Sequence, residues 1–171
     1  MPGPLLFVLL LALGTASAVA TPMAYDSVAG HATTPDSALW GLEKAGESMK
    51  LIFTPSPVDK AKFHLALAEE RIAEAMASEN PETIKTAIKE YIGELAKAMA
   101  ITEGLNSTEL YELVFNATSI HEEQLAMLLD EMLDREEIPS EAKEAIEQAI
   151  VESGRGREEA LEALEGRGGR P

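Results

Sequence analysis

Three histidines and a large set of carboxylates are the side chains in this sequence that could most readily bind a metal or take part in catalysis. The histidines are His31, His64 and His121, and the chain has no cysteine. A carboxylate-bridged di-iron bundle needs a glutamate three residues before each histidine, but alanine and threonine stand at those positions before His64 and His121. A zinc protease motif needs a second histidine four residues after the first, where His121 is followed by Leu125. Neither metal-dependent pattern is present.

The remaining catalytic patterns are also missing their defining spacing. A serine–histidine–acid triad has its parts here, but no nucleophile-elbow or glycine-rich signature places them together. No phosphate-binding loop occurs, and without cysteine there is no thiolate nucleophile, disulfide or thiolate metal site. We therefore predict that the protein is not an enzyme, and we assign no catalytic residue, no cofactor and no metal ligand.

A weaker metal-binding alternative stays open. If the helices that carry them are neighbours, His64 and His121 would be candidate ligands together with Glu69, Glu122 and Glu123. The competing interpretation of His64 is structural: a half-buried imidazole that hydrogen-bonds a neighbouring side chain. His31 lies in a segment with no second ligand nearby.

Composition and charge narrow the class of protein. The 171 residues are 46% hydrophobic and rich in the helix formers alanine, leucine and glutamate, without alternating β-branched runs. The formal net charge is -16, and residues 101–171 carry most of it. This charge argues against nucleic acid and anionic lipid as partners, because binding phosphate requires a basic surface. The pattern predicts an acidic, all-α protein.

The first 20 residues are typical of a secretory signal peptide. An apolar run from Leu5 to Leu13 is followed by small residues, with cleavage expected after Ala18 or Ala20. Because this segment lacks lysine and arginine, an uncleaved anchor is the alternative, although the run is short for a membrane span. We predict export, a flexible leader over residues 21–34, and no stable membrane span after cleavage.

Apolar residues recur at three- and four-residue spacings in five later segments, each bounded by helix caps. The first helix is expected over residues 36–53 with Gly46 at a close approach to a neighbouring helix, and the second from Ser56–Pro57 onward. The third begins at Asn80–Pro81 and ends at Gly104, the fourth follows Asn106, and the fifth runs from near Ser140 to about Leu164 despite Gly154 and Gly156. The expected core-facing residues are Ala38, Leu42, Ala45, Met49 and Ile52; Val58, Ala61, Leu65, Ala68, Ile72 and Ala75; Ile84, Ile88, Tyr91, Leu95 and Ala98; Leu110, Val114, Ala117, His121, Leu125, Leu128 and Met132; and Ile146, Ile150, Ser153, Arg157, Leu161 and Leu164.

Two blocks of the sequence resemble the family called domain of unknown function 5667, which is found in exported prokaryotic proteins. The first block contains Leu39–Trp40, Lys44, Glu47, the proline turn, Lys60, His64–Leu65, Arg71–Ile72 and Glu74; the second contains Leu128, Ile138–Pro139, Ala142–Lys143, Ala145–Ile146, Ser153, Gly156–Arg157–Glu158 and Ala160–Leu161. The sequence departs from the family pattern at Gly41 and at the glycines that flank Arg155. The resemblance implies an exported helical domain, and it carries over no catalytic residue because the family has no assigned reaction.

Together these features predict an all-α antiparallel bundle of about five helices over residues 35–164, followed by a disordered tail over residues 165–171. The function expected is that of an exported or extracytoplasmic module that binds a partner protein or another copy of itself, since the second helix has a heptad-like, coiled-coil seam. Extracytoplasmic metal binding is the alternative. Asn106 and Asn116 fit the glycosylation pattern, and their modification is left open.

Overall fold

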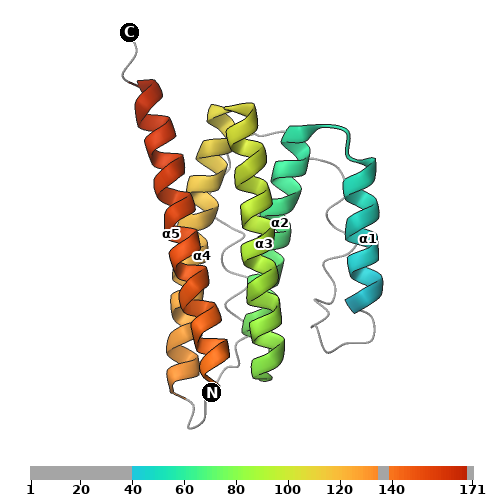
Figure 1. Ribbon diagram of the computed structural model, residues 1–171, viewed down its shortest axis with the longest axis vertical. Coiled ribbons are helices and arrows are strands. Elements are labelled where there is room, and N and C mark those ends of the chain that lie inside the picture. The colour runs from blue at the N-terminus through green and yellow to red at the C-terminus, as the bar shows by residue number, and fades with distance from the viewer. Residues whose placement is uncertain (1–39, 135–138, 169–171) are drawn as a thin grey trace, which may run out of the picture. The chain divides into compact units, whose positions relative to one another are not determined.

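Helices make up almost all of the part of the chain that the structure describes. The computed structural model describes residues 40–134 and 139–168, with side-chain surroundings for residues 44–134 and 139–166. Within these ranges there are five helices and no strand, which confirms the all-α class (Figure 1). The helices are α1 (Trp40–Phe53), α2 (Pro57–Ala77), α3 (Pro81–Leu105), α4 (Thr108–Leu133) and α5 (Ser140–Gly168).

Several predictions concern residues outside the described ranges. These are the signal peptide over residues 1–20, the leader over residues 21–34 with His31, and the first four residues expected for helix α1. None of the described helices is both long enough and apolar enough to cross a lipid bilayer.

The starts of α2 and α3 follow directly from the local sequence, as predicted. Ser56 caps α2 by accepting a hydrogen bond at 3.2 Å from the backbone N–H of Asp59, and Pro57 occupies the first helical position. Asn80 does the same for α3, with Glu82 as donor at 3.0 Å and Pro81 following the cap. In each case the side chain accepts a hydrogen bond from a backbone N–H that has no partner within the helix. Proline has no backbone N–H, so at the first helical position no hydrogen bond of the helix is lost.

The junction between α3 and α4 differs from the prediction by one or two residues. Helix α3 does not end at Gly104 but continues to Leu105, and Asn106 is its C-cap with φ 49° and ψ 43°. Ser107, not Asn106, is the N-cap of α4 and accepts a hydrogen bond from the backbone of Leu110 at 3.4 Å. Asparagine tolerates the left-handed conformation better than most residues, so it ends one helix and leaves the start of the next to serine.

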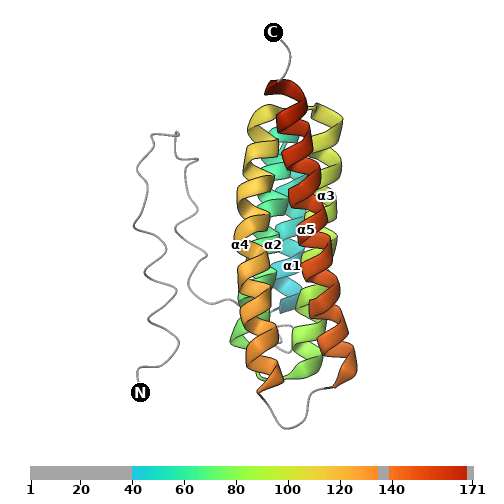
Figure 2. The same cartoon turned by 90° about the vertical axis from the view of Figure 1, so that its left-hand side faces the viewer.

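The helices α2 to α5 pack side by side around one apolar core. Helix α2 contacts α3 most extensively and α4 contacts α5, while α3 also packs on α5 and α2 on α4. Both views show these four helices alongside one another, and Figure 1 shows α1 at one edge next to α2 (Figures 1 and 2). The antiparallel order of the helices stays a prediction. The core includes Leu65, Ile72, Ile84, Ile88, Tyr91, Leu95, Val114, Leu125, Leu128, Met132, Ile146 and Ala160.

Helix α5 is continuous, as predicted, but it is longer, and beyond Ser153 its buried face differs from the expected one. It passes through Gly154 and Gly156 without a break and reaches Gly168, so residues 165–168 of the expected tail are helical. Arg157 and Leu161, expected in the core, are exposed. Ile146 and Ser153 are buried as predicted, and the buried side also carries the small residues Ala149, Gly156 and Ala160.

The difference beyond Ser153 has a physical reason at Gly156. A Cβ atom there would lie 3.5 Å from the Thr118 side chain and 3.6 Å from the sulfur of Met99, which is ordinary van der Waals contact, so α5 packs against both α3 and α4 at this point. Helices can approach closely only where small residues meet, and the gain in packing outweighs the burial of larger side chains on the other face. The expectation that Gly46 marks a close approach is wrong, because nothing lies within 4 Å of its Cβ position.

Candidate functional site

Helix α1 is turned so that its charged side faces the bundle and its apolar side faces solvent. At about 100° per residue, Glu47 lies on the side of the helix opposite Met49 and Ile52. Lys44 and Glu47 are both partly buried, whereas Met49, Ile52 and Phe53 are 58%, 75% and 76% exposed. The prediction that Ala45, Met49 and Ile52 face the core is therefore wrong.

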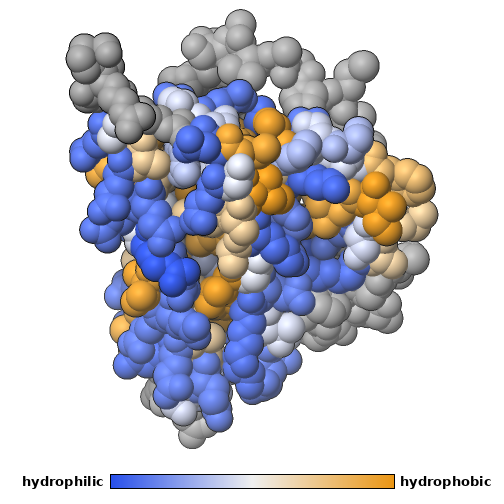
Figure 3. Space-filling view, turned by 45° about the horizontal axis from the view of Figure 1, so that its top comes forward, coloured by the Kyte–Doolittle hydropathy of each residue, from blue (hydrophilic) through white to orange (hydrophobic). Residues whose placement is uncertain are grey.

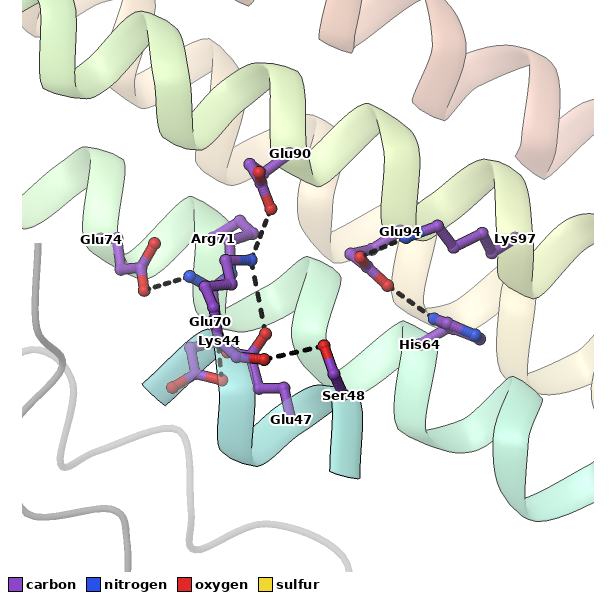
Figure 4. Close-up of polar contacts among 10 residues, drawn as sticks. All are labelled: Lys44, Glu47, Ser48, His64, Glu70, Arg71, Glu74, Glu90, Glu94 and Lys97. Carbon is purple, nitrogen blue, oxygen red and sulfur yellow. Dashed lines mark hydrogen bonds and ion pairs between the residues drawn. The ribbon is translucent and has the colours of Figure 1, made fainter. Parts of the chain in front are cut away.

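The reason for this orientation is a buried arginine on α2. Arg71 is 0% exposed, and its guanidinium contacts three carboxylates (Figure 4). One Nη atom donates to Glu74 at 2.6 Å, while the other pairs with Glu47 of α1 and lies 3.5 Å from Glu70. Removing an arginine from water is costly unless carboxylates replace its hydration. Glu47 can reach Arg71 only if the charged side of α1 faces inward.

A second ion pair joins α1 to α3 beside the first. The ammonium of Lys44 binds Glu90 of α3 and lies 3.4 Å from Glu47 on its own helix. Lys44, Glu47, Arg71, Glu74 and Glu90 thus form a connected charge network, here called the clasp, drawn from three helices (Figure 4). Arginine does not lose its proton at accessible pH, and the clasp contains no hydroxyl or thiol nucleophile, so its chemistry is that of an ionic tie.

His64 belongs to a separate polar contact between α2 and α3. Its Nδ1 lies 2.6 Å from a carboxylate oxygen of Glu94, whose other oxygen accepts from Lys97 at 2.7 Å (Figure 4). Burial by itself would raise the pKa of Glu94, but the hydrogen bonds and charges of Lys97 and His64 outweigh it and lower that pKa. This confirms the structural interpretation of His64 as an imidazole that hydrogen-bonds a neighbour.

His121 is buried in the interior and contacts a different residue from His64. It is 2% exposed, and its ring packs edge-on against Tyr91 with the ring centroids 5.4 Å apart. Burial raises the pKa of the Tyr91 hydroxyl. Ser153 donates to the backbone carbonyl of Thr118 at 3.0 Å and is fully buried, so its hydroxyl is neither free nor accessible as a nucleophile.

Burial should make the stability of the protein depend on the protonation of His121. Burial lowers the pKa of its imidazole to about 4 from the usual 6.5. The unfolded chain therefore takes up this proton first as the pH falls. We expect the free energy of unfolding to decrease by about 3 kcal/mol between pH 6.5 and pH 4 through this residue. Urea unfolding measured across this range checks it.

A His121→Phe variant is the control for this pH dependence. Phenylalanine does not titrate, so the variant should lose less stability than the wild type between pH 6.5 and pH 4. Glu94 acts in a lower range, because a lowered carboxylate pKa removes stability only as the pH falls below its usual value of 4.5. Equal pH dependence of wild type and variant would show that His121 does not titrate as described.

The candidate metal ligands are not brought together. Glu69 and Glu123 are exposed, Glu122 lies 3.2 Å from Arg157, and the two imidazoles contact Glu94 and Tyr91. Within residues 40–134 and 139–168, no three histidine, aspartate or glutamate residues are grouped in a way that would hold a metal ion. The geometry therefore does not favour the metal-binding alternative.

The residues of the clasp carry a signal that sequence reasoning did not use. Arg71 falls between the seam residues Ala68 and Ile72, and Glu74 next to Ala75, where charged side chains are uncommon. A buried arginine requires buried carboxylates, so the spacing of Arg71 and Glu74 already indicated an ionic contact. Lys44, Glu47, Arg71 and Glu74 are also among the residues that carry the family resemblance. Glu90, which pairs with Lys44, and Glu94, which contacts His64, had no such signal.

Comparison with known proteins identifies the family of the chain and nothing more specific. No curated protein and no solved structure matches the chain. A family model described as Domain of unknown function (DUF5667) matches residues 32–167. These residues include all of α1 to α4, the clasp and nearly all of α5. The chain therefore belongs to the DUF5667 family.

Proposed function

We propose that this protein is an exported helical module that acts by association rather than catalysis, and that the apolar side of α1 is its contact face. The single observation that supports the proposal most is the exposure of Met49, Ile52 and Phe53 on one helix. Apolar surface gathers where α1 lies, at the right-hand side of the molecule in Figure 3. Grouped apolar side chains of this kind are typical of protein contact sites.

The charge distribution favours a second copy of the chain as the occupant of this face. Helix α1 carries two glutamates and two lysines, whereas α4 carries six acidic residues and no lysine or arginine. Two copies that meet through α1 would bury apolar side chains while their acidic helices stay apart. A contact around a two-fold axis is self-complementary, so one apolar face is sufficient for a dimer. The face is small, which predicts weak, concentration-dependent association.

Ile52→Glu should weaken this association. The residue is 75% exposed, so the change should leave the fold intact, but it places a charge in the proposed contact. We expect the dissociation constant to rise about tenfold or more. Sedimentation equilibrium or light scattering after size exclusion, over a wide concentration range, measures it.

The matched control is Val151→Glu on α5. Val151 is 68% exposed, so this variant adds the same charge to an already acidic protein at a similar exposed apolar position. It should associate like the wild type. A wild type that stays monomeric at every concentration contradicts self-association through α1, as does an equal weakening by both variants.

Export is supported by the sequence of residues 1–20, with its apolar run and small residues before the expected cleavage points. Fractionation of native cells tests this part of the proposal. Recovery of the protein from the extracytoplasmic fraction, beginning at Val19 or Thr21, supports it, and recovery from the cytoplasm alone contradicts it.

A further inference from the structure

Helices α2 to α5 contain a hydrophobic core that does not depend on α1. Every buried apolar residue of the core, and every partly buried one packed against it, comes from α2, α3, α4 or α5 among the residues whose side chains are described. Helix α2 also begins with its own cap, Ser56, and with Pro57. The four-helix bundle therefore has what it needs to stay folded without α1.

The described contacts of α1 with the bundle are mainly ionic. Glu47 pairs with Arg71 of α2, and Lys44 pairs with Glu90 of α3. Lys50 adds a cation–π contact, with its ammonium 4.8 Å from the centre of the Phe63 ring. No described helix shares an extensive backbone contact with α1. The contribution of such ion pairs to stability depends on their geometry, and it is lost when one of the two charged side chains is removed.

The connection between α1 and α2 is suited to a hinge. Helix α1 ends at Phe53, and residues 54–56 are not helical before α2 begins at Pro57. Pro55 and Pro57 have no backbone N–H and disfavour a helix through the residues before them, so α1 and α2 cannot merge into one rigid rod. A change of angle at this linker would leave the cap of α2 in place.

From these observations we infer that α1 is a releasable arm, held against the bundle by the clasp, which opens as a unit while α2 to α5 stay folded. An isolated helix of 14 residues is marginal in water, so the released arm loses its helical structure. The inference deepens the proposed function. It rests on that function in one respect only, which is that the arm carries the proposed contact face. The clasp would then control whether that face is presented in a fixed position.

Glu47→Leu tests the arm directly. Leucine and glutamate have similar helix propensities, so the change removes the ion pair with Arg71 without weakening α1 as a helix. Amide hydrogen exchange read by mass spectrometry, on the full chain at a concentration where it is monomeric, should show exchange in α1 about tenfold or more faster. The protection of α3, α4 and α5 should not change. Glu69→Leu, at an exposed position on α2, is the matched control and should leave α1 unchanged.

Two results would overturn the inference. The first is unchanged exchange in α1 of the Glu47→Leu variant. The second is a wild type in which α1 exchanges only through global unfolding, with the same free energy of opening and the same denaturant dependence as α3. Because the measurement uses the monomer, its outcome is independent of whether the chain self-associates. A result that contradicts the release of α1 can thus be distinguished from one that contradicts self-association through α1.

Discussion

Ile146→Asp is expected to lower the free energy of unfolding by about 4 kcal/mol or more, which is a large fraction of the stability of a typical domain. Ile146 is 0% exposed and lies on the side of α5 that packs against the core. The carboxylate would have no ionic partner there, so the chain must either bury an unpaired charge or open the bundle. Urea or thermal unfolding followed by circular dichroism measures the change.

Val151→Asp separates burial from any general effect of charge on α5. The same substitution on the same helix, at a side chain that is 68% exposed, should change the free energy of unfolding by less than about 0.5 kcal/mol. Leu65→Asp, at a buried position on α2, should resemble Ile146→Asp. Near-unchanged unfolding of Ile146→Asp would mean that this face of α5 is not in the core.

Arg71→Met is expected to cost about 3–5 kcal/mol of stability, although it replaces a charged residue with an apolar one of similar length. Glu74 is 0% exposed and receives a hydrogen bond from Arg71 at 2.6 Å, so the variant removes a charged donor from a buried carboxylate. Glu47 loses the same partner. Equilibrium unfolding in urea gives the magnitude, and exchange in α1 should accelerate as it does in Glu47→Leu.

A double variant shows whether the cost comes from the loss of the ion pair between Arg71 and Glu74. Arg71→Met combined with Glu74→Leu removes both members of the buried pair, and replacement of such a pair by apolar residues is often neutral or stabilising. We expect the double variant to recover most of the stability that Arg71→Met loses. If the two substitutions are simply additive, the energetic coupling between Arg71 and Glu74 is absent.

The boundaries of most helices were predictable because they depend on nearby residues. The caps Ser56 and Asn80 act within three residues of themselves, and the prolines after them restrict the chain locally. The seams of α2 and α3 were also predicted correctly, since large and small apolar residues alternate on one clear face. The junction at Asn106 and Ser107 was missed because two adjacent residues both suit a cap, and only the backbone angle at Asn106 distinguishes their roles.

The face of α1, and the face of α5 beyond Ser153, were predicted wrongly for a different reason. Hydrophobic periodicity identifies a helix and its apolar side, but it does not say what that side meets. In α5 the packing at Gly156 brings the small residues into the core. In α1 the carboxylate of Glu47 is needed by Arg71, and this requirement outweighs the burial of Met49 and Ile52. Both outcomes depend on groups that lie far away in the sequence.

The sequence by itself determined that this is an acidic helical protein, where most of its helices begin, and its resemblance to the family to which it belongs. Those properties depend on composition, on caps and on spacing, all of which act over a few residues. Only the tertiary structure decided that His64 and His121 occupy separate contacts, that Arg71 is the centre of the clasp, and that the apolar side of α1 faces outward. The physical reason is that a buried charge must find its partners in space, and Glu47 and Glu90 are brought to the clasp by the packing of three helices.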